Sequence, residues 1–176
     1  WAMDGTQYDM GLTGKIYLCN MQDLGSRYKF LPLAGGYPVG EQIAEHLSES
    51  IDRYGAPLVL KRDNEGNMNH ATVNDVLQEF FILPLNSPEY YAPYNGAIEE
   101  SQRELKRCLR DKLALDLPTP GDHIAVYAEA VVNDLNHRHR PCLNGRTSCQ
   151  LFFESANKPT FSKRERREIY DSIMEK

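Results

Sequence analysis

The feature that most constrains the fold is a pair of short apolar runs separated by one helical pattern. The first run spans 58–61 and directly follows Gly55-Ala56-Pro57, and the second is Phe81-Ile82-Leu83. A helical apolar face begins between them at Asn69 or Thr72 and comprises Val73, Val76, Leu77 and Phe80. A strand, a helix and a second strand at this spacing predict a parallel crossover connection.

Three further strands are predicted ahead of this crossover, at 1–10, 15–23 and 27–33. Their turns are expected at Gly11 to Gly14 and at Gly25-Ser26. An amphipathic helix then precedes Gly55, with an apolar line formed by Val39, Ile43, Leu47 and Ile51. The predicted fold class is α/β: a five-stranded mixed sheet of three antiparallel strands plus two in parallel crossover, flanked by helices.

The second half of the chain is predicted to be helical after one loop. Residues 84–95 are rich in Pro, Tyr, Asn and Ser, which predicts a mobile loop. Helices are expected at about 97–115, 122–137, 147–153 and 162–176, with a break at 117–121. We expect a core domain over 1–153 and a C-terminal helical extension over 154–176.

Composition excludes several classes of protein. The chain has 176 residues, of which 41% are hydrophobic and 26% charged, as in one globular domain. No apolar run approaches the ~20 residues that cross a bilayer, and no signal-peptide pattern is present. The chain begins at Trp1 rather than Met, so we expect an excised domain or a processed fragment. The net charge of −5 argues against DNA binding by bulk charge alone.

The four cysteines, Cys19, Cys108, Cys142 and Cys149, lack the spacing of a disulfide framework. We expect reduced thiols, because disulfides are rare in reducing compartments. The expected location is therefore the cytoplasm, in association with the nucleoid, or the nucleus if the source is eukaryotic.

Three acidic residues stand out by their place in the predicted fold. Asp4 lies on the first strand, Asp63 follows the fourth strand, and Glu99 lies in the first turn of the helix after the loop. Two strand ends and a helix start can bring three carboxylates together. Ions of the Mg²⁺ type take such hard oxygen ligands, and two of them ~3.5–4 Å apart stabilise both the attacking and the leaving oxygen of phosphodiester cleavage. The alternative for each acid alone is a solvated surface or turn carboxylate, as we expect for Asp9, Asp23 and Glu65.

The segments around these acids resemble the catalytic core of the DDE transposases and retroviral-type integrases. The resemblance is carried by Trp1-Ala2-Met3-Asp4, by Asp63-Asn64, by Asn95-Gly96-Ala97-Ile98-Glu99, and by the 35 residues that separate Asp63 from Glu99. It implies a ribonuclease-H-like fold in which Asp4, Asp63 and Glu99 are catalytic and hold Mg²⁺ or Mn²⁺, two ions per site. One departure is Glu65, which stands before Gly66 where the family has Asp-Asn-Gly.

A basic row follows Glu99 on the same predicted helix face. Arg103, Lys106 and Arg110 stand four, seven and eleven residues later, and we expect them to contact DNA phosphates. The alternative is a solvated charged face with intrahelical ion pairs. Asn95, Tyr91 and Tyr94 in the preceding loop are further candidates for DNA contact, because tyrosines can stack on unpaired bases; they can equally be packing residues.

A second motif lies near the C-terminus. The run from Asn136 to Pro141, followed by 143–147, resembles a segment of the same family that leads into the final helix. We expect a structural role for it, with Arg140 near phosphate. A zinc site formed by His137, His139, Cys142 and Cys149 is disfavoured, because the spacing does not match the common structural sites.

The resemblance implies a DNA recombinase that cleaves element ends as an endonuclease and joins the freed 3′-hydroxyl to target DNA by transesterification. It further implies double-stranded DNA as partner and a homodimer or larger assembly. Two alternatives remain open, namely a ribonuclease-H-like nuclease that cuts without joining and a domesticated, non-catalytic DNA-binding or assembly module. Retention of Asp4, Asp63 and Glu99 favours an enzyme.

Overall fold

A computed structural model describes residues 1–9, 14–88, 96–115, 124–154 and 161–175. Five strands form one sheet in the order β3-β2-β1-β4-β5. They are β1 (Ala2–Asp9), β2 (Lys15–Gln22), β3 (Leu33–Gly35), β4 (Val59–Arg62) and β5 (Leu83–Asn86). The pairs β1–β2 and β2–β3 are antiparallel, whereas β1–β4 and β4–β5 are parallel. The predicted mixed sheet and its parallel crossover are therefore confirmed.

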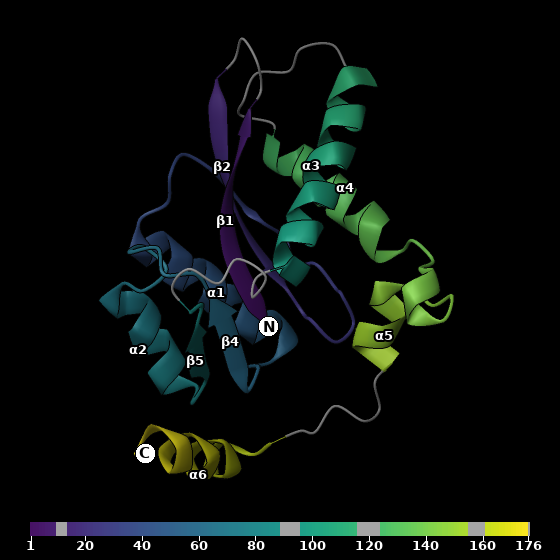
Figure 1. Ribbon diagram of the computed structural model, residues 1–176. Coiled ribbons are helices and arrows are strands. Elements are labelled where there is room, and N and C mark those ends of the chain that lie inside the picture. The colour runs from purple at the N-terminus through teal and green to yellow at the C-terminus, as the bar shows by residue number, and fades with distance from the viewer. Residues whose placement is uncertain (10–13, 89–95, 116–123, 155–160, 176) are drawn as a thin grey trace.

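Helices cover both faces of this sheet, with α3 and α4 on one side and α1 and α2 on the other (Figure 1). They are α1 (Gly40–Tyr54), α2 (Ala71–Glu79), α3 (Gly96–Leu115), α4 (Ile124–Asn136), α5 (Ser148–Glu154) and α6 (Lys163–Met174). The guanidinium of Arg166 on α6 donates to the carbonyl oxygens of Ala56 and Pro57. Within the described ranges, no helix is long and apolar enough to span a bilayer. All four cysteines are free thiols.

Strand periodicity determines which side chains reach which helix layer. Successive residues of a strand point to opposite faces. Met3 and Tyr17 therefore pack in the core with α1 and α2, whereas Tyr8 and Leu18 pack in the core with α3 and α4. Asp4 has the same parity as Tyr8, so its side chain is directed to the α3 face of the sheet.

The third strand begins later than predicted. The sequence pattern placed it at 27–33, but β3 starts at Leu33, and Lys29 forms a single antiparallel bridge to Gln22. Arg27 has a φ of 60°, and Pro32 lacks a backbone N–H, so neither continues a regular strand. The Lys29 N–H instead donates to Asn136 Oδ1 at 2.9 Å, and Asn136 Nδ2 donates to the Lys29 carbonyl at 2.8 Å.

The fifth strand is also displaced, from the predicted 81–83 to Leu83–Asn86. Phe81 has a φ of 52°, which turns the chain before the strand begins. Pro84 was predicted to start a loop but lies within β5, where a proline is tolerated because the strand is at the sheet edge.

The helix before Gly55 largely follows its prediction. Ile43, Leu47 and Ile51 are buried, and Gly55 ends α1 with a φ of 83°. Val39 was wrongly placed on the apolar line, since it is the N-cap residue and is 55% exposed. Residues 11–13 of the predicted turn from Gly11 to Gly14 lie outside the described residues, as does the predicted helix break at 117–121.

Candidate active site

Two of the predicted metal ligands lie side by side on adjacent parallel strands, Asp4 within β1 and Asp63 just past the end of β4. Met3 of β1 pairs with Arg62 of β4, so the next residues along each strand are Asp4 and Asp63. Asp4 is only 9% exposed. Its pKa is raised from 3.8 to about 6, mainly because the carboxyl group is buried and next because the Asp63 carboxylate lies close.

Helix α3 contributes polar side chains to the same carboxyl group. Gln102 Nε2 donates to Asp4 Oδ2 at 2.9 Å, and this bond favours the charged form of Asp4. Burial lowers the pKa of Lys106, one turn later, and the nearby Asp4 carboxylate acts in the opposite direction. Glu99 lies three residues before Gln102, so both belong to one flank of α3. The Glu99 side chain itself is exposed.

The structure therefore brings Asp4 and Asp63 together but does not bring Glu99 into contact with them. Among the described residues, no three His, Cys, Asp or Glu side chains are grouped as a metal ion would require. Asp4 and Asp63 nevertheless fit a divalent cation, because both offer hard oxygen donors and their mutual repulsion would be relieved by a bound positive charge. Glu99 would have to change its side-chain conformation to complete the set.

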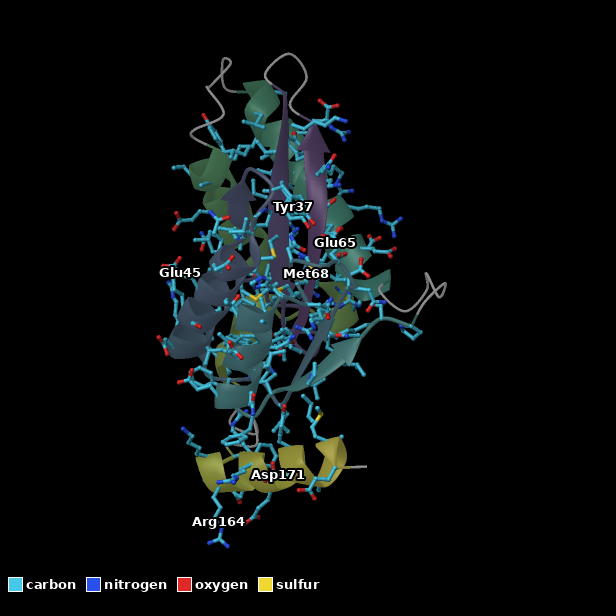
Figure 2. All side chains as sticks on the ribbon, turned by 90° about the vertical axis from the view of Figure 1, so that its left-hand side faces the viewer. Tyr37, Glu45, Glu65, Met68, Arg164 and Asp171 are labelled. Atoms are coloured by element: carbon cyan, nitrogen blue, oxygen red, sulfur yellow. The ribbon has the colours of Figure 1, made fainter. Side chains whose placement is uncertain are left out.

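Glu65 is a member of this acidic site that the sequence reading missed. It was expected to be a surface or turn acid, but it is half-buried, and Tyr17 Oη donates to Glu65 Oε2 at 2.7 Å. Its charge also raises the pKa of Asp4. Gly5 makes the tyrosine's position possible, since a Cβ there would lie 1.5 Å from the Tyr17 hydroxyl oxygen. Figure 2 labels Glu65 in the middle of the molecule, far from α6.

Asp63 is held by a dense set of hydrogen bonds around the loop that follows β4. Arg62 is 3% exposed and donates to Met68 O, Asn74 Oδ1 and Asn86 Oδ1 at 2.7, 2.7 and 2.9 Å. Asn69 Nδ2 donates to the carbonyl oxygens of Asp63 and Glu65 at 2.8 and 2.9 Å. No residue pattern predicted this role of Arg62, because a Lys-Arg pair at a strand end is usually solvated.

The opposite flank of α3 carries a buried ion network. Glu104 accepts two hydrogen bonds from Arg140, both 3.0 Å long, and lies 3.2 Å from Lys29 Nζ. Burial alone would raise the pKa of Glu104, but the bonds from Arg140 and the charge of Lys29 lower it overall. Asn136 and Arg140 both belong to the predicted C-terminal motif, and both attach that segment to the rest of the fold.

The predicted DNA contacts have different surroundings. Arg103 forms an exposed ion pair with Glu100 at 3.1 Å, which is the alternative that the sequence left open for it. Lys106 is half-buried beside Asp4, and Arg110 is exposed. Tyr91, Tyr94 and Asn95 lie outside the described residues.

The disfavoured zinc set is not assembled in the structure. His137 Nδ1 lies 2.9 Å from the Asn133 carbonyl oxygen, and His139 Nδ1 lies 2.6 Å from that of Gly145. The described residues contain no group of three potential ligands around these rings.

No family model and no curated protein matches the chain. Among solved structures, it is similar to a chain of the simian T-cell lymphotropic virus intasome in complex with PP2A regulatory subunit B56 gamma, with a TM-score of 0.75 and 18% identity. That match covers 92% of this chain but only 56% of the other.

Isolated integrase cores are matched over almost their full length. The HTLV-2 integrase catalytic core in complex with magnesium gives a TM-score of 0.72 at 18% identity, over 86% of this chain and 94% of that one. The BIV integrase catalytic core gives 0.63 at 22% identity, over 88% and 93%. The chain therefore has the fold of a retroviral integrase catalytic core, which is the ribonuclease-H-like fold that its sequence motifs implied.

Proposed function

We propose that this protein is a metal-dependent DNA recombinase that cleaves element DNA ends and joins the 3′-hydroxyl to target DNA by transesterification. The observation that carries the proposal is the pairing of Asp4, within β1, with Asp63, just past the end of the adjacent strand β4, which helps to raise the pKa of Asp4 to about 6. Two like charges held together in a partly buried site cost stability, and such perturbed groups are concentrated at functional sites. The fold shared with integrase cores supports a polynucleotidyl-transfer reaction at this pair.

Asp4 and Asp63 would hold Mg²⁺ or Mn²⁺, with Glu99 as the third ligand. When bound, two such ions supply stabilisation of the negative charge that develops on the attacking and leaving oxygens. The chain's own residues orient the ligands, since Gln102 fixes the Asp4 carboxyl group and Asn69 binds the Asp63 carbonyl. The magnesium described for the HTLV-2 integrase core supports this choice of ion.

Double-stranded DNA is the proposed substrate, and Arg103, Lys106 and Arg110 are its proposed phosphate contacts on α3. Lys106 is the member placed next to Asp4, so it would meet the phosphate closest to the reacting group. Asn95, Tyr91 and Tyr94 remain proposed contacts from the loop before α3. The intasome match and the trimeric and dimeric forms described for the HTLV-2 core support a homo-oligomer.

The decisive experiment is Glu99→Gln in a metal-dependent strand-transfer assay with a recessed duplex end and a plasmid target. We expect joined products to fall to background, because the substitution removes a charged ligand. Glu100→Gln is the matched control, since this neighbouring acid is also exposed on α3 and lies ~100° away around the helix. Joining by Glu99→Gln at the wild-type rate would refute the ligand assignment.

Two rival functions give different outcomes in the same experiments. A nuclease of this fold would cut the plasmid or the duplex end but yield no joined product. A non-catalytic DNA-binding or assembly module is favoured by one observation, the lack of a three-ligand group among the described residues. Calorimetric titration with Mg²⁺ tests this second rival, because a module without the site would take up no ion.

A further inference from the structure

A strongly basic cavity of about 310 Å³ lies on the flank of α3 opposite to Asp4. Five basic side chains line it, namely Arg27, Lys29, Arg103, Arg107 and Arg140, and two acidic ones, Glu100 and Glu104. Three positive charges are therefore in excess, although the chain as a whole carries −5. Ala97 is the one apolar residue among the lining residues that the structure describes. An apolar ligand is accordingly excluded, and an anion is favoured.

The cavity is separate from the acidic site because the two are lined by different flanks of α3. Ala97, Ser101 and Glu104 recur every three or four residues and form one flank of α3. Gln102 and Lys106, which contact or approach Asp4, form the other. The buried stripe of Ile98, Leu105 and Leu109 lies between the two flanks. A molecule in the cavity therefore lies on a different flank of α3 from a ligand at Asp4, and Arg103 is the one proposed DNA contact that also lines the cavity.

The charges in the cavity are only partly compensated within the chain. Glu104 is shared between Lys29 and Arg140, and Glu100 pairs with Arg103. Arg27 and Arg107 are exposed and have no ion pair among the described residues. Among the described residues, the buried Nε of Arg140 also has no hydrogen-bond partner. Two guanidinium groups without an ion pair and one N–H donor without an acceptor therefore belong to residues that line the same cavity.

We propose that this cavity binds phosphate groups, with Arg27 and Arg107 as the principal contacts and Arg140 as the buried support. Guanidinium groups match phosphate oxygens in pairs, which makes arginine the side chain of choice for this ligand. The volume is at the lower end of the ~300–1,000 Å³ typical of ligand pockets, so it suits a small polar group. The phosphate can belong to a nucleic-acid strand or to a small polyphosphate.

The test compares the double variant Arg27→Gln/Arg107→Gln with Arg164→Gln/Arg167→Gln in the whole chain. The control pair lies on α6, where Arg164 points away from the rest of the molecule (Figure 2), and it removes the same charge. Both experiments are run with a chelator present, so that the outcome does not depend on the metal site or on the proposed recombinase activity. In the first, pyrophosphate is titrated by calorimetry. We expect the cavity variant to lose at least tenfold in affinity and the control to keep it.

The second experiment measures binding of a labelled duplex by fluorescence anisotropy over a series of salt concentrations. Loss of two phosphate contacts is expected to reduce the slope of log affinity against log salt by about 2 in the cavity variant and not in the control. A reduced slope identifies a nucleic-acid strand as the source of the phosphate. Loss of pyrophosphate binding with an unchanged slope identifies a small polyphosphate. Equal behaviour of the two variants in both experiments would overturn the proposal.

Discussion

An acidic side chain with little exposure to solvent lies on each flank of α3, Asp4 on one and Glu104 on the other, and the charges around these two acids have opposite signs. On one flank, the buried Asp4 faces two further carboxylates, and its pKa rises to about 6. On the other, the half-buried Glu104 faces Lys29 and Arg140, and its pKa falls. Burial penalises the charge on both acids, so the sign of the neighbouring charges decides which way each pKa moves.

This difference separates a stabilising region from a functional one. The Glu104 network pairs this carboxylate within the chain and connects α3 to the segments before β3 and after α4. At the Asp4 site three carboxylates lie near a single cation, Lys106, so negative charge is in excess and binding of a cation would be favourable. We therefore expect substitutions on the two flanks to change stability in opposite directions.

The largest effect is expected from Glu104→Gln. It leaves the buried Lys29 and the half-buried Arg140 without a counter-charge, and breaking a buried ion pair typically costs about 3–5 kcal/mol. Urea unfolding measures the change. The exposed Glu100→Gln is the control and should stay within about 0.5 kcal/mol of wild type. A Glu104→Gln protein as stable as this control would show that the network is not structural.

Asp4→Asn is expected to stabilise the metal-free protein by about 1–3 kcal/mol at pH 8. Because the folded-state pKa of Asp4 is raised, the favourable contribution of its protonated form is present below pH 3.8 and is lost as the pH rises through about 6. Asparagine resembles the protonated form at every pH, so the advantage of the variant should grow between pH 4 and 7.

Unfolding curves at pH 4 and pH 8, with a chelator present, check this sign. Added Mg²⁺ should then stabilise the wild type and leave Asp4→Asn nearly unchanged, because a bound ligand stabilises only the form that binds it. A variant less stable than wild type at pH 8 would mean that Asp4 is satisfied within the chain, and the contrast between the flanks would be lost.

The smallest effect is expected from Tyr17→Phe, which removes the hydrogen bond to Glu65. The loss should be about 0.5–1.5 kcal/mol, because Glu65 is only half-buried and can be partly rehydrated. Tyr170→Phe on α6 is the control, since its ring contact with Phe81 is retained. A Tyr17→Phe protein more stable than the Tyr170→Phe control would show that the hydrogen bond from Tyr17 to Glu65 does not stabilise the fold.

The sequence predicted those features that follow from local periodicity and from strand ends. The crossover, the apolar stripe of α1 and the meeting of Asp4 with Asp63 were all readable, because each depends on spacing along the chain. The late start of β3 was not, because the positive φ of Arg27 and the bonds between Lys29 and Asn136, more than a hundred residues away, are tertiary features.

The same limit applies to the candidate site. Gln102 reaches Asp4 across a separation of 98 residues, and Glu65 reaches Tyr17 across 48. Both contacts depend on how the helices are seated on the sheet, which residue patterns do not encode locally. The assignment of Glu99 as a ligand rests on its motif and on its flank of α3, and it remains a prediction.

The side-chain amide of Asn136 covers the edge of the sheet at Lys29. The Tyr28 carbonyl accepts from the Asp23 N–H, and the Phe30 N–H donates to the Met21 carbonyl. The Lys29 N–H and carbonyl are therefore directed outward, and the Asn136 amide binds both. These are the two bonds that a residue of an incoming strand would make. A single side chain thus caps the sheet at Lys29 and protects this point from edge-to-edge aggregation. Assembly of copies by adding strands here would first require displacing that amide.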